Sequence, residues 1–256
     1  MSFNSEFILF EKDNDIGILT LNRANKHNAI NKEYMNELSN FLDFAEKEPL
    51  KALVATSSGK NVFAAGGDIE YFLKLTSKKD AFSMALQMHN ILSRFEDLEY
   101  PTVCAINGSA IGGGAEIILA FDIRFARSNI FIQFKEKEMG VTTGWGGTYR
   151  LVNIVGYSKA LKMLLSAEKI DAKQAKDIGL VDDIYEESVL LDKTLEFCYN
   201  LKDDDVKLIK YIKRLAKESQ FINRDEGMQL ERVLFSDSWM FGKREKQMKK
   251  FISKRV

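Results

Sequence analysis

The sequence is poor in the residue types that build disulfide frameworks and metal sites. Among its 256 residues there are two cysteines, Cys104 and Cys198, and two histidines, His27 and His89. Two cysteines give neither a disulfide framework nor metal-ligand spacing. Two histidines leave little material for a zinc site or a histidine-based catalytic triad. We therefore expect no metal centre.

An excess of charge and a long apolar run are also missing. Lysine plus arginine and aspartate plus glutamate number 37 each, so the formal net charge is zero. This balance argues against nucleic acid or an anionic membrane as the main partner. No apolar run approaches the roughly 20 residues that a membrane-spanning helix needs, and the first residues lack the apolar core of a signal peptide. We expect a cytoplasmic protein with no nucleic-acid or membrane partner.

Strand and helix patterns alternate along most of the chain. Apolar runs predict strands at residues 6–10, 16–21, 52–56, 102–106, 123–126 and 130–134. Apolar side chains at helical spacing predict amphipathic helices over 31–47 and 81–95. This alternation favours an α/β fold with a buried sheet. From about residue 200 the pattern changes to polar helices with few glycines, so we predict a core domain over 1–199 and a helical domain over 200–256.

A glycine turn follows the predicted strand at 102–106. That strand ends at Asn107-Gly108, three glycines stand at 112–114, and an apolar segment of helical length begins at Ala115. Such a turn brings bare backbone N–H groups to a helix N-terminus, where Glu116 lies in the first turn. The turn carries neither Gly-x-Gly-x-x-Gly nor Gly-Lys-Ser/Thr, which argues against phosphate binding. By itself, the stretch is equally consistent with a tight structural turn.

Two further glycine-rich turns occur at 62–69 and 140–151. The first follows an apolar segment and the second leads into a predicted helix. Two turns that each offer an N–H to one cleft can form an oxyanion hole, where losing one donor typically costs about 3 to 4 kcal/mol. Carboxylates near that hole could move protons at carbons beside a carbonyl. Glu116 and Glu136 are the candidates, although a glutamate that stands among charged residues, as Glu136 does, is more often a solvated surface side chain.

Four motifs in order then point to a family. They occupy residues 21–29, 63–69, 107–116 and 144–151, at fitting separations. With them the chain resembles the enoyl-CoA hydratase/isomerase (crotonase) superfamily from about Phe7 to Arg255. The resemblance implies a spiral of ββα turns with a helical C-terminal trimerisation domain, assembled as a homotrimer or a hexamer. It implies an acyl-CoA thioester substrate and neither a metal nor a redox cofactor, since CoA is part of the substrate.

The resemblance also implies roles for individual residues. The oxyanion-hole amides would belong to Gly67 and Gly113, and the two catalytic glutamates would be Glu116 and Glu136. The amide of Gly144 would help to hold the attacking water. The residues implied in binding the CoA ester are Lys26, Ala65, Ile69, Trp145, Phe235 and Lys254.

We predict from these residues a 2-enoyl-CoA hydratase. Some positions depart from the hydratase pattern: Lys135 and Thr143 replace prolines, Trp145 fills a position that is often small, and Glu70 stands where a basic residue often meets the nucleotide. The run from Lys137 with Trp145 resembles the superfamily's acyl-CoA decarboxylase branch, of the methylmalonyl- or ethylmalonyl-CoA type. Decarboxylation, double-bond isomerisation with one glutamate, and a catalytically silent binding protein remain alternatives. The presence of both glutamates favours the hydratase.

Overall fold

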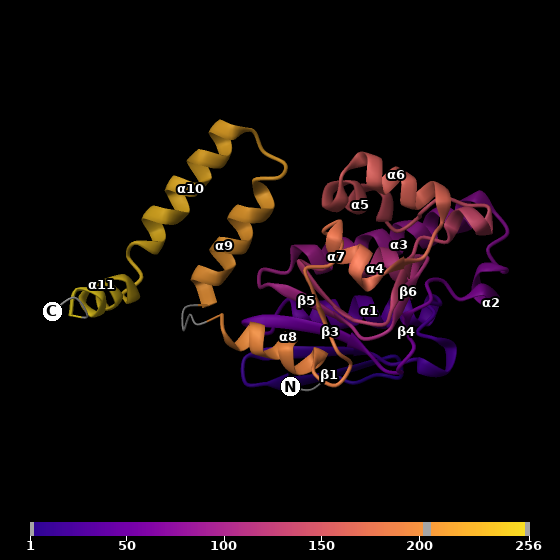
Figure 1. The fold of residues 1–256 in the computed structure, drawn as a ribbon, viewed down its shortest axis with the longest axis horizontal. Coiled ribbons are helices and arrows are strands. Elements are labelled where there is room, and N and C mark those ends of the chain that lie inside the picture. The colour runs from indigo at the N-terminus through magenta and orange to yellow at the C-terminus, as the bar shows by residue number, and fades with distance from the viewer. Residues whose placement is uncertain (1–2, 202–205, 254–256) are drawn as a thin grey trace. The chain divides into compact units, whose positions relative to one another are not determined.

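The computed structural model describes residues 3–201 and 206–253, and divides into two compact units, Met1–Lys202 and Asp203–Val256 (Figure 1). The first unit holds every strand of the described chain. None of the helices in the described ranges is long and apolar enough to cross a membrane.

Two sheets form the centre of the first unit. The larger sheet has the strand order β1-β2-β3-β5-β7-β10 and the smaller one the order β4-β6-β8-β9. Only the β1–β2 and β8–β9 pairs are antiparallel among the described strands. The strands are β1 (Ile8–Asp13), β2 (Ile16–Leu21), β3 (Ala52–Ser57), β4 (Val62–Ala64), β5 (Thr102–Ile106), β6 (Ser109–Ile111), β7 (Ile123–Arg127), β8 (Phe131–Gln133), β9 (Ile170–Asp171) and β10 (Asp183–Tyr185).

Consecutive strands alternate between the two sheets. In the pairs β3/β4, β5/β6 and β7/β8, the first strand joins the larger sheet and the second joins the smaller one. A helical segment follows each pair, so the chain winds as three ββα turns. The α/β prediction is therefore confirmed, including the spiral of ββα turns.

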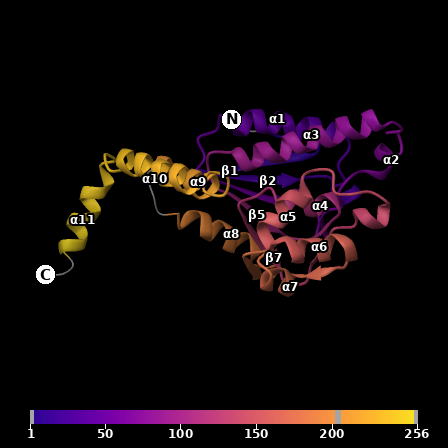
Figure 2. The same cartoon turned by 90° about the horizontal axis from the view of Figure 1, so that it is seen from above.

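The helical segments of the first unit differ in length and in their place around the sheets. They are η1 (Ala24–Lys26), α1 (Lys32–Ala45), α2 (Ile69–Phe72), α3 (Lys78–Asp97), α4 (Gly113–Ile118), η2 (Glu136–Met139), α5 (Gly147–Val155), α6 (Tyr157–Ser166), α7 (Ala172–Asp177) and α8 (Leu190–Tyr199). The long helices α1 and α3 lie side by side, as both ribbon views show (Figure 2). Each begins at a capping side chain, Asn31 for α1 and Ser77 for α3, which accepts a hydrogen bond from an orphan backbone amide.

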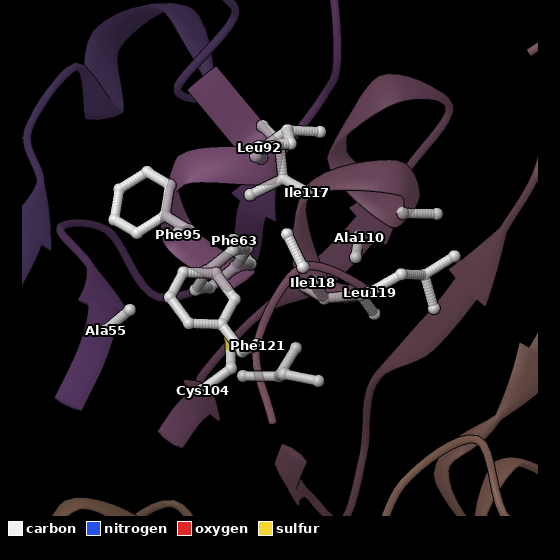
Figure 3. Packing of buried hydrophobic residues seen from close by; sticks show 14 of the residues in the cluster. Ala55, Phe63, Leu92, Phe95, Cys104, Ala110, Ile117, Ile118, Leu119 and Phe121 are labelled. Carbon is white, nitrogen blue, oxygen red and sulfur yellow. The ribbon is translucent and has the colours of Figure 1, made fainter. Parts of the chain in front are cut away.

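The hydrophobic core fills the space between the larger sheet, α1, α3 and α4. Strand β5 is buried along its whole length, as expected for a parallel strand covered on both faces. Cys104 projects from it into the core close to Phe121, in the same cluster as Phe63 and Phe95 (Figure 3). Both cysteines of the sequence are buried free thiols. The prediction that Cys104 is a core residue is confirmed.

The sequence patterns predicted one strand of the smaller sheet, β8 within 130–134, and missed β4, β6 and β9. The missed strands are only two or three residues long, too short to form the apolar runs that mark the larger sheet. The helix after the glycine triplet is also shorter than its apolar run, because α4 ends at Ile118. These short strands nevertheless place the turns of the site described below.

The second unit consists of helices in its described part. These are α9 (Val206–Glu218), α10 (Arg224–Ser238) and α11 (Lys243–Ser253). Asn223 caps α10 through two backbone amides. Many apolar side chains of this unit are exposed, among them Phe221, Val233, Phe235, Met240, Phe251 and Ile252.

Candidate active site

The ends of β4 and β6 bring two glycine turns into contact. Gly66 has a φ of +87°, and a Cβ there would lie 2.7 Å from the Gly113 nitrogen. Any side chain at Gly66 would therefore separate the turns. Within the described chain, the backbone amides of Gly67 and Gly113 donate no hydrogen bond to another protein group. Two unpaired donors from neighbouring turns are the arrangement that an oxyanion hole requires.

Glu116 projects from the first turn of α4 and is 2% exposed. Its carboxylate accepts three backbone hydrogen bonds: Oε2 from the amides of Trp145 at 2.8 Å and Gly147 at 2.7 Å, and Oε1 from Gly144 at 3.3 Å. The predicted water-holding amide of Gly144 is thus directed at Glu116. The sequence predicted that Glu116 lies beside the N–H groups at the start of its own helix, whereas its donors in the structure lie just before α5 and at its first residue.

The loop from Gly144 to Gly147 is shaped closely around that carboxylate. A Cβ at Gly147 would lie 2.5 Å from Cγ of Glu116, so only glycine lets the backbone come so near. The Trp145 side chain is 3% exposed and covers Gly113, where a Cβ would lie 2.3 Å from its six-membered ring. The indole Nε1 donates to Sδ of Met84 on α3 at 3.2 Å. Trp145 thus lies directly beside one of the two unpaired amides.

Glu136 is the first residue of η2, and its carboxyl group points inward. Both carboxyl oxygens are buried and have no hydrogen-bond partner within the described residues. A Cβ at Gly112, next to the unpaired amide of Gly113, would lie 3.6 Å from Oε1 of Glu136. The interpretation of Glu136 as a solvated surface side chain is therefore wrong, because its neighbours in sequence are exposed while its own carboxyl group is not.

The two glutamates influence each other electrostatically. Burial, and then the charge of Glu136, raise the pKa of Glu116 from its ordinary value of 4.5 to about 7, against the lowering effect of the three amides. Burial raises the pKa of Glu136 as well. A carboxylate held by three donors and a second carboxyl group without any are suited to different protonation states.

Apart from the buried Trp145, the predicted CoA-binding residues of the first unit lie close together. Lys26 and Ile69 are exposed, and the Ala65 amide donates to the carbonyl of His27 beside Lys26 at 3.0 Å. The Lys26 ammonium pairs with Glu70 at 3.1 Å. The structure therefore brings Lys26, Ala65 and Ile69 together, and places Glu70 as the direct partner of the lysine.

The other two predicted CoA-binding residues belong to the second unit. Phe235 lies on α10, is 60% exposed, and has its ring centroid 5.3 Å from that of Trp239. Lys254 lies outside the described residues.

Two residues near Glu116 were missed as functional candidates. Gly147 donates to Glu116, and Arg150 contacts the carbonyl of Trp145. Both residues belong to the motif at 144–151. The sequence of this motif does not distinguish an amide donor or a buried guanidinium from other residues at the start of a helix. Among the residues that the structure describes, no group of three or more His, Cys, Asp or Glu side chains is placed to hold a metal ion.

The α/β spiral carries two buried carboxyl groups beside two backbone amides that can form an oxyanion hole. This site defines a protein that could move protons beside a carbonyl group, and comparison with known proteins identifies the family. The family model described as enoyl-CoA hydratase/isomerase matches residues 11–256, so the chain belongs to this family.

Individual relatives cover nearly the whole chain. Ethylmalonyl-CoA decarboxylase of Mus musculus is 33% identical over 90% of this chain and 73% of that protein. Crotonyl-CoA hydratase of Syntrophomonas wolfei is 30% identical over 98% of this chain and 96% of that protein. The crystal structure of enoyl-CoA hydratase from Thermoplasma volcanium matches with a TM-score of 0.87 and 29% identity, covering 96% of this chain and 97% of that one.

Proposed function

We propose that this protein is a 2-enoyl-CoA hydratase, which adds water across the 2,3-double bond of an enoyl-CoA thioester. The observation that carries the proposal is the pair of buried carboxyl groups: Glu116, held by three amides, and Glu136, held by none. Addition of water needs both a base for the water and an acid for the adjacent carbon. The hydratases among the relatives support the same reaction.

We assign the two roles from the hydrogen-bond donors around each carboxyl group, although burial and the charge of Glu136 raise the pKa of Glu116 to about 7. Three amide donors favour the ionised form of Glu116, so it accepts a proton from water as the water oxygen bonds to the β-carbon. Burial disfavours the anion of Glu136, whose carboxyl oxygens have no hydrogen-bond partner from another described residue, so we give Glu136 the proton that is transferred to the α-carbon. Between these events the π electrons of the 2,3-double bond form a double bond from the α-carbon to the carbonyl carbon, and the carbonyl π electrons move onto the thioester carbonyl oxygen. The amides of Gly67 and Gly113 stabilise that enolate.

Hydration of crotonyl-CoA tests the proposal directly. We expect the purified protein to remove the absorbance of the conjugated enoyl thioester, and we expect Glu116→Gln to lower kcat by about 10²- to 10⁴-fold. Absence of turnover in the wild-type protein, with CoA esters still bound, would exclude the hydratase function.

The pH dependence should report Glu116. Glu116 must be ionised to act as the base. We therefore expect kcat/KM to fall as pH drops below about 7, the pKa of Glu116. The folded state also binds this proton more tightly than the unfolded state does. The free energy of unfolding should therefore decrease by about 3 kcal/mol as pH rises from 4.5 to 7, at about 1.4 kcal/mol per unit. Denaturant titrations at several pH values check this, and Glu116→Gln should reduce the slope to the part that the raised pKa of Glu136 contributes.

Glu70 should weaken binding of the CoA nucleotide. Its carboxylate pairs with Lys26, one of the predicted CoA-binding residues, and adds negative charge there. We expect Glu70→Gln to lower KM for crotonyl-CoA by about 2- to 5-fold at low salt, to leave kcat unchanged, and to lose its effect in high salt. Glu168→Gln is the matched control, because Glu168 pairs with Lys162 at the same distance of 3.1 Å. A fall in KM in the control as well would contradict the assignment.

Decarboxylation of a malonyl-type thioester is the second candidate. The bulky Trp145, packed beside Gly113, favours it, as does the similarity to ethylmalonyl-CoA decarboxylase. This reaction needs the oxyanion hole and a proton donor but no attacking water. Two results together would favour decarboxylation over hydration. The rate of CO2 release from ethylmalonyl-CoA would exceed the rate of crotonyl-CoA hydration, and Glu116→Gln would retain this CO2 release.

We also propose that the helical second unit assembles the protein as a homotrimer or a dimer of trimers. The exposed apolar side chains of α10 and α11 support a self-association surface. Light scattering on the purified protein gives the mass: three or six chains are expected, and a monomer at micromolar concentration would contradict the proposal.

A further inference from the structure

Arg150 lies directly behind the loop that holds Glu116. It stands in the first turns of α5 and is 5% exposed. One guanidinium nitrogen donates to the carbonyl of Trp145 at 2.8 Å. Another donates to Oε2 of Glu96 on α3 at 2.6 Å and to Oγ of Ser93 at 3.4 Å. A buried guanidinium thus ties the carbonyl of this loop to the long helix α3.

The contact is made at the centre of the loop. Gly146 has a φ of +90°, and a Cβ there would lie 2.3 Å from the same guanidinium nitrogen that bonds Trp145. The residue before Gly146 and the residue after it both donate amides to Glu116. Since one peptide plane joins the Trp145 carbonyl to the Gly146 nitrogen, fixing that carbonyl fixes the orientation of the loop between the two donors.

We infer that Arg150 is a positioning residue, which holds the Trp145 carbonyl so that the amides of Trp145 and Gly147 point at Glu116. The inference rests on the proposed role of Glu116 as the base. Glu96 and Ser93 in turn orient the guanidinium, whose planar fork can serve a carbonyl and a carboxylate together. A lysine has only a point charge to offer at this position.

Arg150→Met tests the inference, with Arg127→Met as the matched control. Arg127 is 6% exposed and also bonds one carbonyl, that of Lys60 at 2.6 Å, and one carboxylate, that of Glu187 at 3.1 Å. Removal of either arginine should lower thermal stability to a similar extent. Only removal of Arg150 should weaken the amide hydrogen bonds to Glu116 and so change the pKa of that group.

Two readouts separate positioning from structural support. In Arg150→Met we expect kcat for crotonyl-CoA to fall about 10- to 100-fold with little change in KM. We also expect the acid limb of kcat/KM to move up by about one pH unit, because weaker amide bonds stabilise the Glu116 anion less. Arg127→Met should leave the limb in place.

A direct titration makes the test independent of turnover. The carboxyl carbon of Glu116, followed by NMR in ¹³C-glutamate-labelled protein and identified by its absence in Glu116→Gln, should titrate about one unit higher in Arg150→Met than in the wild type. If the wild type hydrates crotonyl-CoA but Arg150→Met keeps its acid limb and its Glu116 titration, the inference is overturned while the proposed function stands. If the wild type shows no hydration, the NMR titration alone decides it.

A second variant approaches the same contact from the loop side. Gly146→Ala would displace the guanidinium without removing its charge, and Gly156→Ala supplies the control. Gly156 has a similar φ of +84°, but a Cβ there would meet no atom within 4 Å. The upward shift of the Glu116 titration should appear in Gly146→Ala and not in Gly156→Ala. Equal titrations in the two variants would contradict the positioning role.

Discussion

Replacement of Glu136 by glutamine is expected to lower kcat for crotonyl-CoA hydration by about 10²- to 10⁴-fold and, at the same time, to stabilise the fold. The activity falls because glutamine has no acidic proton to transfer to the α-carbon. The residue keeps the same length and shape, so the enoyl thioester should still bind and KM should change little.

The gain in stability has a separate physical cause. Both carboxyl oxygens of Glu136 are buried without a hydrogen-bond partner among the described residues, and burial raises the pKa of this group. Above that pKa, folding must either bury the charge or keep the proton, and both cost free energy. At pH 8 we expect Glu136→Gln to raise the free energy of unfolding by about 1 kcal/mol. The difference should vanish at low pH, where the wild-type group is protonated in both states.

Steady-state kinetics at pH 8 and urea titrations at pH 4 and pH 8 measure the two effects. Glu138→Gln is the control, because Glu138 lies on the same turn of η2 but is exposed and paired with Lys135. It should change neither kcat nor stability by more than a small amount. A Glu136→Gln variant that is less stable at pH 8 would show that the carboxylate has a stabilising partner, contrary to the unpaired geometry.

Replacement of Gly113 by alanine is expected to reduce kcat/KM by about 10²- to 10³-fold, the loss typical of one oxyanion-hole donor. The new Cβ would lie 2.3 to 2.7 Å from three atoms of the buried Trp145 ring. Because the ring is enclosed, the backbone of Gly113 must shift, and its amide then leaves the position where the enolate oxygen forms. Overpacking of this kind should also cost about 1 to 3 kcal/mol of stability.

Gly144→Ala provides the comparison that isolates this effect. Gly144 also lies in the site, but the nearest atom to a Cβ there is Cβ of Ala85 at 4.0 Å, an ordinary contact. The variant keeps its amide and should retain activity within a few-fold of the wild type. Crotonyl-CoA kinetics on folded samples, checked by circular dichroism, distinguish the two substitutions. Equal activities would mean that the Gly113 amide does not stabilise the transition state.

The sequence by itself determined the strands of the larger sheet, the family and part of the site. Apolar runs such as 52–56 and 102–106 are buried parallel strands because a strand covered on both faces must be apolar throughout. The glycine triplet at 112–114 placed Glu116 in the first turn of a helix, as the structure has it. The order of four motifs was enough for the family, which the comparison confirms.

The tertiary structure alone decided what surrounds the two glutamates. Glu136 stands among charged residues and carries no local sign of burial, yet the turn of η2 directs its carboxyl group inward. The three amides on Glu116 come from residues 28 to 31 positions further along the chain, and the buried Arg150 reaches back to Glu96 on α3. Such contacts depend on how separate turns of the spiral pack. Local sequence patterns report which residues favour a helix or a strand, but the burial and partners of a carboxyl group arise only when distant segments meet.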